Sequence, residues 1–237
     1  KTILKDISKD NSNSSYLKKA LSMMLNNNKV NETISFIENK RTSNPDFFAL
    51  ELGMHYSISM DIPKSLNEFL IYLKYNPKKK DFVFNRILAF PDIENINNQI
   101  ISYLEENKDD TSLLLLSKIL FKQKEYEKSY ELVLNTKNND KELLRLIQDF
   151  VKIKKYDMAQ EIINQIFKTK RDKKTIEDAI YQLAQIFEEQ IINSKNNVLL
   201  SYNTNRNQLL NSPFNKINQE KNNLLEKAIN IYDSLRI

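Results

Sequence analysis

Residues 49–77, which read ALELGMHYSISMDIPKSLNEFLIYLKYNP, determine the fold expected for this chain. On each side of a short turn near residue 60, apolar or small residues recur three or four positions apart. That period places them on one face of an α-helix. Gly53 and Ser65 lie twelve positions apart, one in each half, and their small side chains allow two helices to approach closely. The stretch therefore predicts a hairpin of two antiparallel helices.

The same spacing of twelve residues recurs along the chain. The pairs are Leu21/Thr33, Gly53/Ser65, Phe84/Ile96, Ser117/Ser129 and Ile147/Ala159. Their second members follow one another at intervals of 30 to 33 residues. A repeat of this length predicts stacked helical hairpins, because a single hairpin cannot bury its apolar faces alone. The residues predicted to pack within and between hairpins are Gly53, Ser65, Ser117, Ser129, Ala159, Ala184 and Ala228.

The quoted stretch resembles the tetratricopeptide repeat. The resemblance rests on Ala49-x-x-Leu52-Gly53-x-x-Tyr56, Ser65-x-x-x-Phe69-x-x-Tyr72 and Pro77, and on the turns Lys124-x-Tyr126-x-x-Ser129 and Lys154-x-Tyr156-x-x-Ala159. It covers roughly residues 14–190. It implies an all-α, right-handed superhelical solenoid of about six stacked antiparallel hairpins, and a role in binding other proteins.

The predicted domain organisation follows the repeat. An N-terminal extension, 1–13, precedes hairpins at about 14–45, 46–76, 77–108, 109–139, 140–172 and 173 onward. The third of these is irregular, because Pro91 ends its first helix early.

The last hairpin is predicted to contain an insertion. Ala184 and Ala228 are 44 positions apart, which is twelve plus one repeat of 32. An Asn-rich stretch, 191–219, lies between them, and a closing helix follows at 220–237. The stretch is either a low-complexity expansion or an arm that packs on the solenoid or reaches a partner. No polar cap follows the closing helix, so the chain is interpreted as a piece of a longer array, the alternative being that its last face is a docking surface.

In the tetratricopeptide family, the first helix of each hairpin lines a concave groove. The resemblance implies that the partner-binding positions here are Leu50, Met54, Asp81, Asn85, Leu114, Lys118, Leu144, Gln148, Tyr181 and Gln185. These positions lack the Lys and Asn arrangement with which one subset of the family grips a C-terminal carboxylate. The mixed apolar and polar set suits a helix or an extended peptide. The alternative is that some of these side chains pack between repeats.

Composition excludes several kinds of active site. The chain of 237 residues has one Gly and no Cys, so phosphate-cradling loops, dinucleotide fingerprints, disulfides and thiolate metal sites are not expected. His55, the single histidine, has no second ligand or triad partner. The adjacent acids Glu105/Glu106, Asp109/Asp110 and Glu188/Glu189 diverge on a helix and are expected at solvated ends and faces. We therefore predict a non-enzymatic protein with no catalytic residue, metal or cofactor.

The formal net charge of +5 raises a second possibility. A helical-repeat RNA-binding protein would use excess Lys on phosphates, but the Lys residues are scattered among Glu and Asp, so nucleic acid is the less favoured partner. The main hypothesis is a scaffold that binds one or more proteins. A third hypothesis is a structural subunit that self-assembles through uncapped ends. No stretch is apolar enough to predict a membrane span. The start at Lys1 and the absence of Cys favour a bacterial cell envelope over the cytoplasm.

Overall fold

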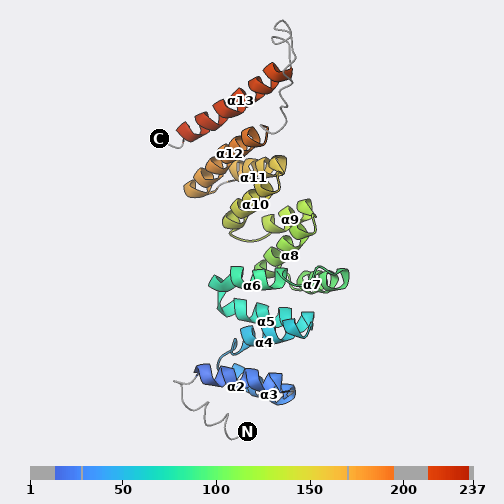
Figure 1. Cartoon of the computed structure of the whole chain (residues 1–237). Helices are drawn as coiled ribbons and strands as arrows, with labels where there is room; N and C mark the ends of the chain where they lie inside the picture. The colour runs from blue at the N-terminus through green and yellow to red at the C-terminus, as the bar shows by residue number, and fades with distance from the viewer. Residues whose placement is uncertain (1–13, 28, 170, 195–212, 235–237) are drawn as a thin grey trace. The chain divides into compact units, whose positions relative to one another are not determined.

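The computed structural model describes residues 14–27, 29–169, 171–194 and 213–234, and these residues form α-helices and one short 3-10 helix without any strand (Figure 1). The predicted all-α class is confirmed. The described residues form α2 (Ser14–Asn26), α3 (Val30–Arg41), α4 (Ala49–Ile58), α5 (Ile62–Tyr75), η2 (Pro77–Lys79), α6 (Lys80–Leu88), α7 (Glu94–Glu106), α8 (Asp110–Lys122), α9 (Tyr126–Leu134), α10 (Asp140–Lys152), α11 (Tyr156–Lys168), α12 (Lys173–Ser194) and α13 (Pro213–Ser234).

The chain divides into two compact units, residues 1–132 and 133–237, which we call unit 1 and unit 2. Helices within each unit pack against neighbouring helices, as in a helical repeat.

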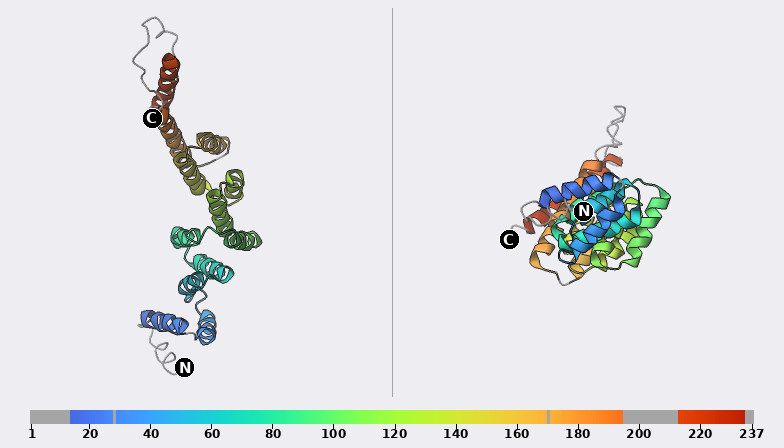
Figure 2. Two further views of the ribbon diagram at one scale, coloured as in Figure 1. Left: turned by 45° about the vertical axis from the view of Figure 1, so that its right-hand side comes forward. Right: turned by 90° about the horizontal axis from the view of Figure 1, so that it is seen from below.

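Unit 1 begins with α2 and α3, which lie side by side (Figure 2). Leu17, Leu21 and Leu25 recur every four residues on α2 and are all buried. They share a hydrophobic cluster with Leu52 and Tyr56 of α4. The first hairpin therefore buries its apolar face partly against the second.

In the second hairpin, α4 and α5 come into close contact at Gly53, the single glycine of the sequence. The buried hydroxyl of Ser65 on α5 donates a hydrogen bond of 2.8 Å to the carbonyl oxygen of Gly53 on α4. A Cβ atom added at Gly53 would lie 2.8 Å from the Phe69 ring. In the later hairpin of α8 and α9, the hydroxyl of Ser117 donates to the carbonyl of Ser129, also at 2.8 Å. The twelve-residue pairs thus face each other across these two hairpins.

One type of turn connects the two helices of several hairpins. The residue just before the second helix donates its backbone N–H to the carbonyl five positions earlier. These bonds are Lys29 to Met24 (3.0 Å), Asp61 to Tyr56 (3.0 Å), Glu125 to Leu120 (2.9 Å) and Lys155 to Phe150 (2.9 Å). Met60, Lys124 and Lys154 adopt the left-handed conformation in the last three turns. This arrangement satisfies carbonyls at the end of a helix that would otherwise lack a partner.

The connection between α6 and α7 differs. α6 ends at Leu88, three residues before Pro91, and the Ile93 N–H bonds to the Pro91 carbonyl at 2.9 Å. Proline has no N–H to donate and disfavours a helical residue before it. α7 packs against α5 and α8, and its buried Ile96, Ile100 and Leu104 join the larger core of unit 1.

Unit 2 is built from α10 to α13 together with the end of α9. α10 and α11 form a hairpin, and both also contact α12. α12 and α13 lie along each other (Figure 1), with Ala184 and Ala228 buried. The rings of Tyr181 and Tyr232 are 5.9 Å apart between these two helices. Burial and a hydrogen bond with Glu188 raise the pKa of Tyr232 to about 12.

The ends of α12 and α13 reach into the predicted insertion. α12 continues to Ser194 and α13 starts at Pro213, whereas the sequence predicts the insertion over 191–219. Proline is well tolerated in the first turn of a helix, because its missing N–H has no helical partner there. The predicted extension at 1–13 and residues 195–212 of the predicted insertion lie outside the described residues.

Polar contacts link elements about one repeat apart within each unit. In unit 1 the Arg41 guanidinium pairs with the buried carboxylate of Glu68, and the Asn76 amide donates to Asp46 at 2.6 Å. In unit 2, Arg171 donates to Asn139 at 2.8 Å. Arg41 ends α3 and its partner Glu68 lies within α5, whereas the other two contacts join segments at helix ends. Links between elements about one repeat apart are the pattern that a repeating architecture produces.

Candidate functional site

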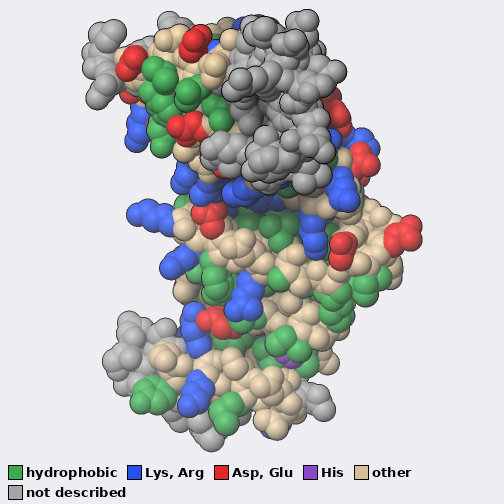
Figure 3. Space-filling model, turned by 45° about the horizontal axis from the view of Figure 1, so that its top comes forward, with side chains coloured by type: hydrophobic (Ala, Val, Ile, Leu, Met, Phe, Trp, Pro, Cys, Tyr) green, Lys and Arg blue, Asp and Glu red, His purple; other side chains and the backbone are tan. Residues whose placement is uncertain are grey.

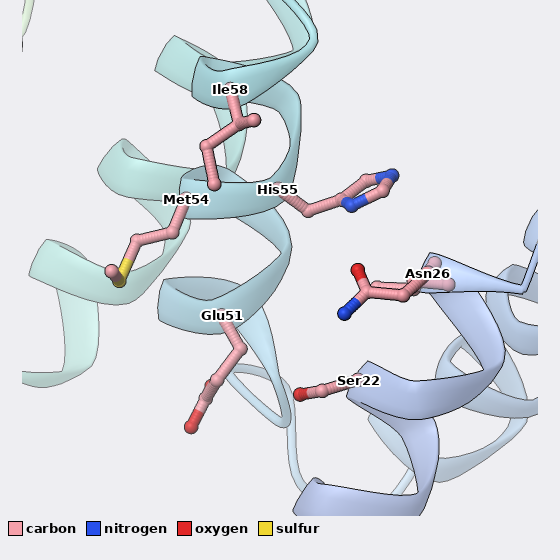
Figure 4. Close-up of a pocket in the computed structure, with 7 residues that line it drawn as sticks. Ser22, Asn26, Glu51, Met54, His55 and Ile58 are labelled. Atoms are coloured by element: carbon pink, nitrogen blue, oxygen red, sulfur yellow. The ribbon is translucent and has the colours of Figure 1, made fainter.

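A pocket of about 220 Å³ lies between α2 and α4 in unit 1 (Figure 4). Its lining residues are Ser22, Leu25, Asn26, Glu51, Met54, His55 and Ile58. The lining residues are at positions 22, 25 and 26 on α2 and at positions 51, 54, 55 and 58 on α4, which is the spacing of one helix face. Each helix thus contributes a single face to the pocket. By sequence position, these are the first helices of two consecutive hairpins.

The apolar part of the pocket is graded from buried to exposed. Leu25 is buried in the first core cluster, and Met54 is half-buried. Ile58, the last residue of α4, has 83% of its surface exposed. In the view of Figure 4, Met54 extends to the left of α4 and His55 to its right, with Ile58 above them. An apolar side chain entering the pocket would gain contact with Met54 and Ile58.

Polar groups border the pocket. The Lys18 ammonium pairs with the Glu51 carboxylate at 2.8 Å, and the Ser22 hydroxyl donates to the Lys18 carbonyl at 3.0 Å. Figure 4 shows the side chains of His55 and Asn26 on the same side of the pocket. In the space-filling view of one face, the purple histidine lies beside hydrophobic side chains at the surface (Figure 3). The border can therefore hydrogen-bond polar groups that flank an apolar ligand side chain.

The size of the pocket limits its occupant. Sites for small organic ligands and cofactors usually have volumes of about 300–1,000 Å³. At about 220 Å³ this pocket is smaller and has room for one large side chain. It is suited to anchoring a residue of a peptide or helix.

The ten predicted groove residues do not converge on one site. Met54 alone among them lines the pocket. Leu50, Met54 and Leu114 pack against the larger core of unit 1. Lys118, Leu144 and Gln185 are half-buried, while Asp81, Asn85, Gln148 and Tyr181 are exposed, and the ring of Tyr181 packs on Tyr232 of α13. Part of the predicted groove thus consists of side chains that pack between helices.

The seven predicted packing residues are all buried. Most of the pocket was not predicted from the sequence, namely Ser22, Leu25, Asn26, Glu51 and Ile58. The repeat itself carries a signal for part of it, since Ser22 lies 32 positions before Met54 and Lys18 lies 32 before Leu50. Extending the predicted groove by one repeat toward the N-terminus identifies Ser22 and the Lys18 that pairs with Glu51.

The other candidate groups have local roles. Asp109 caps α8, accepting hydrogen bonds from the Thr111 and Ser112 backbone N–H groups at 2.9 and 3.2 Å. Within the described residues no group of three or more His, Asp or Glu side chains is arranged to hold a metal ion. The helices that the structure describes include none with the length and apolarity to cross a bilayer.

Neither a protein-family model nor a curated protein matches this chain.

Proposed function

We propose that the chain is a non-enzymatic scaffold of tetratricopeptide-like, right-handed stacked hairpins that binds a segment of another protein. The observation that carries this proposal is the pocket between α2 and α4, with Met54 and Ile58 at its apolar side. The sequence pattern assigns both helices to the first position of their hairpins, which is the position that lines the groove in the family that the sequence resembles.

The proposed ligand is a helix or an extended peptide with one large apolar side chain. Burying such a side chain contributes about 1.5–3 kcal/mol, which is modest, so further contacts along the first helices are needed for stable binding. Ile58 lies at the exposed end of α4, with 83% of its surface already in water. Replacing Ile58 should therefore weaken binding and have little effect on folding.

The proposal is tested by capturing binding partners from an extract of the native source on three immobilised chains. The extract is used with and without nuclease treatment, at low and at moderate salt. The chains are the wild type, Ile58→Asp and the matched control Ile93→Asp. Ile93 is the same residue type, 54% exposed, and precedes α7 outside the pocket. We expect one or more proteins bound by the wild type and the control but lost from Ile58→Asp.

Equal recovery of the same proteins on all three chains would contradict a role for the pocket. Recovery of RNA without nuclease, falling steeply as salt rises, would instead support the RNA-binding alternative. A solution mass that increases with concentration for all three chains would support self-assembly.

A further inference from the structure

We propose that unit 2 carries a second interaction surface, a cluster of exposed lysines that binds an acidic segment of a partner protein. We call this surface the basic edge and define it by Lys137, Lys141, Lys168, Arg171 and Lys174. It lies where the α9–α10 connection meets the α11–α12 connection. It does not depend on the pocket in unit 1, so either proposal can fail without the other.

Arg171 holds the two connections together. Its Nη1 donates to the Asn139 side-chain oxygen at 2.8 Å and also pairs with Asp140, while its Nε donates to the Thr169 hydroxyl at 2.9 Å. Asn139 is itself buried, and its amide donates to the Val133 carbonyl at 3.0 Å. The flanking lysines therefore project from a joint of two connections that the hydrogen bonds of Arg171 link to each other.

The charge of this joint is large for its size. The described residues of 135–141 and 168–174 include six Lys or Arg and two Asp, a formal charge of +4, which is close to the +5 of the whole chain. Both carboxylates have partners within the unit. Asp140 pairs with Arg171, and Asp172 accepts hydrogen bonds from the Thr175 backbone N–H (3.0 Å) and hydroxyl (2.7 Å).

Four lysines are left to face solvent. Lys137, Lys141, Lys168 and Lys174 are exposed, and none forms an ion pair with another described residue. Lys173 differs, because it lies 3.5 Å from Glu177 on α12. The N-termini of α10 and α12 lie at the same joint and add positive partial charge. The surface therefore complements a run of carboxylates.

A protein segment fits this surface better than a nucleic acid does. Single-stranded nucleic acids are usually held by a basic groove with aromatic side chains on which successive bases stack. Among the described residues next to the basic edge, Phe167 is the exposed large aromatic side chain, with 41% of its surface in water. One such ring does not form a platform for successive bases. A patch limited to two loops matches a few consecutive Asp or Glu residues, whose charges follow one another every ~3.3 Å in an extended chain.

The test measures the affinity of a fluorescein-labelled oligo-glutamate peptide for the full chain by fluorescence anisotropy. The variant replaces Lys137, Lys141, Lys168 and Lys174 with Gln. The matched control replaces Lys19, Lys29, Lys78 and Lys108 with Gln. These four are exposed lysines of unit 1, so both variants have the same net charge. Circular dichroism verifies that both remain folded.

We expect the wild type and the control to bind equally well and the basic-edge variant to bind about tenfold more weakly, because each exposed ion pair contributes roughly a factor of two. Equal weakening in both variants would show a general charge effect and overturn the proposal, as would no binding by the wild type. A labelled single-stranded oligonucleotide of equal charge is measured in parallel. Tighter binding of the oligonucleotide, lost in the basic-edge variant, would assign the surface to nucleic acid and overturn the proposed partner class.

Discussion

At the residue scale, the single glycine shows how one position constrains a hairpin. Gly53 is buried on α4 directly against the Phe69 ring of α5, and its carbonyl oxygen accepts a hydrogen bond from the Ser65 hydroxyl. A glycine inside a helix costs about 1 kcal/mol relative to alanine. The close approach of the Phe69 ring explains why glycine occupies this position.

Replacing Gly53 with Ala is expected to lower the free energy of unfolding by about 1–2 kcal/mol. The new Cβ would meet Phe69 atoms at 2.8 and 2.9 Å, and overpacking of about 1–3 kcal/mol exceeds the helix-propensity gain. Urea unfolding followed by circular dichroism measures the change. Adding Phe69→Leu should cost less in the Gly53→Ala background than alone, because the smaller side chain makes room. A Gly53→Ala protein more stable than the wild type would contradict this packing role.

At the element scale, the shared turn gives the hairpins their common form. Met60, Lys124 and Lys154 each have a positive φ, of 59°, 68° and 61°, two residues before a second helix. Glycine is the usual residue at such a position, because it has no Cβ to clash. This chain uses lysine or methionine there instead, so the hydrogen bonds of each turn hold a side-chain-bearing residue in an unfavourable conformation.

Lys154→Gly is accordingly expected to raise the free energy of unfolding by about 0.5 kcal/mol, since glycine adopts a positive φ at little cost. The matched control is Lys152→Gly, at the last residue of α10, which is expected to lower it by up to about 1 kcal/mol. Both values come from urea unfolding at neutral pH. If both variants changed the free energy of unfolding in the same direction, the left-handed conformation of Lys154 would contribute no strain.

At the scale of the whole molecule, each helix depends chiefly on its neighbours. The polar links run between elements about one repeat apart, as between Arg41 and Glu68 or between Arg171 and Asn139. In proteins with this pattern, stability is approximately a sum of local units and nearest-neighbour interfaces. Loss of packing in one region should therefore stay local.

Phe150→Ala tests that expectation. Phe150 on α10 is completely buried, and truncation of such a side chain costs about 3–5 kcal/mol. Hydrogen exchange followed by mass spectrometry should show faster exchange in α10, α11 and α12, which contact one another, and unchanged exchange in α4 and α5. Faster exchange throughout the chain would show a single cooperative unit.

The helical class follows from the amino-acid sequence alone, because spacings of three and four residues and the near absence of glycine leave few other ways to bury these apolar side chains. Local spacing also predicted that Gly53 and Ser65 would lie near each other, since two helices joined by a short turn return along themselves. The pocket and the basic edge needed the tertiary structure. Ser22 and His55, which line one pocket, and Asn139 and Arg171, which share a hydrogen bond, are separated by about one repeat in sequence and come together only when hairpins pack. Such contacts depend on the angle and offset between helices, which arise from the fit of many side chains and which the repeat spacing alone does not specify.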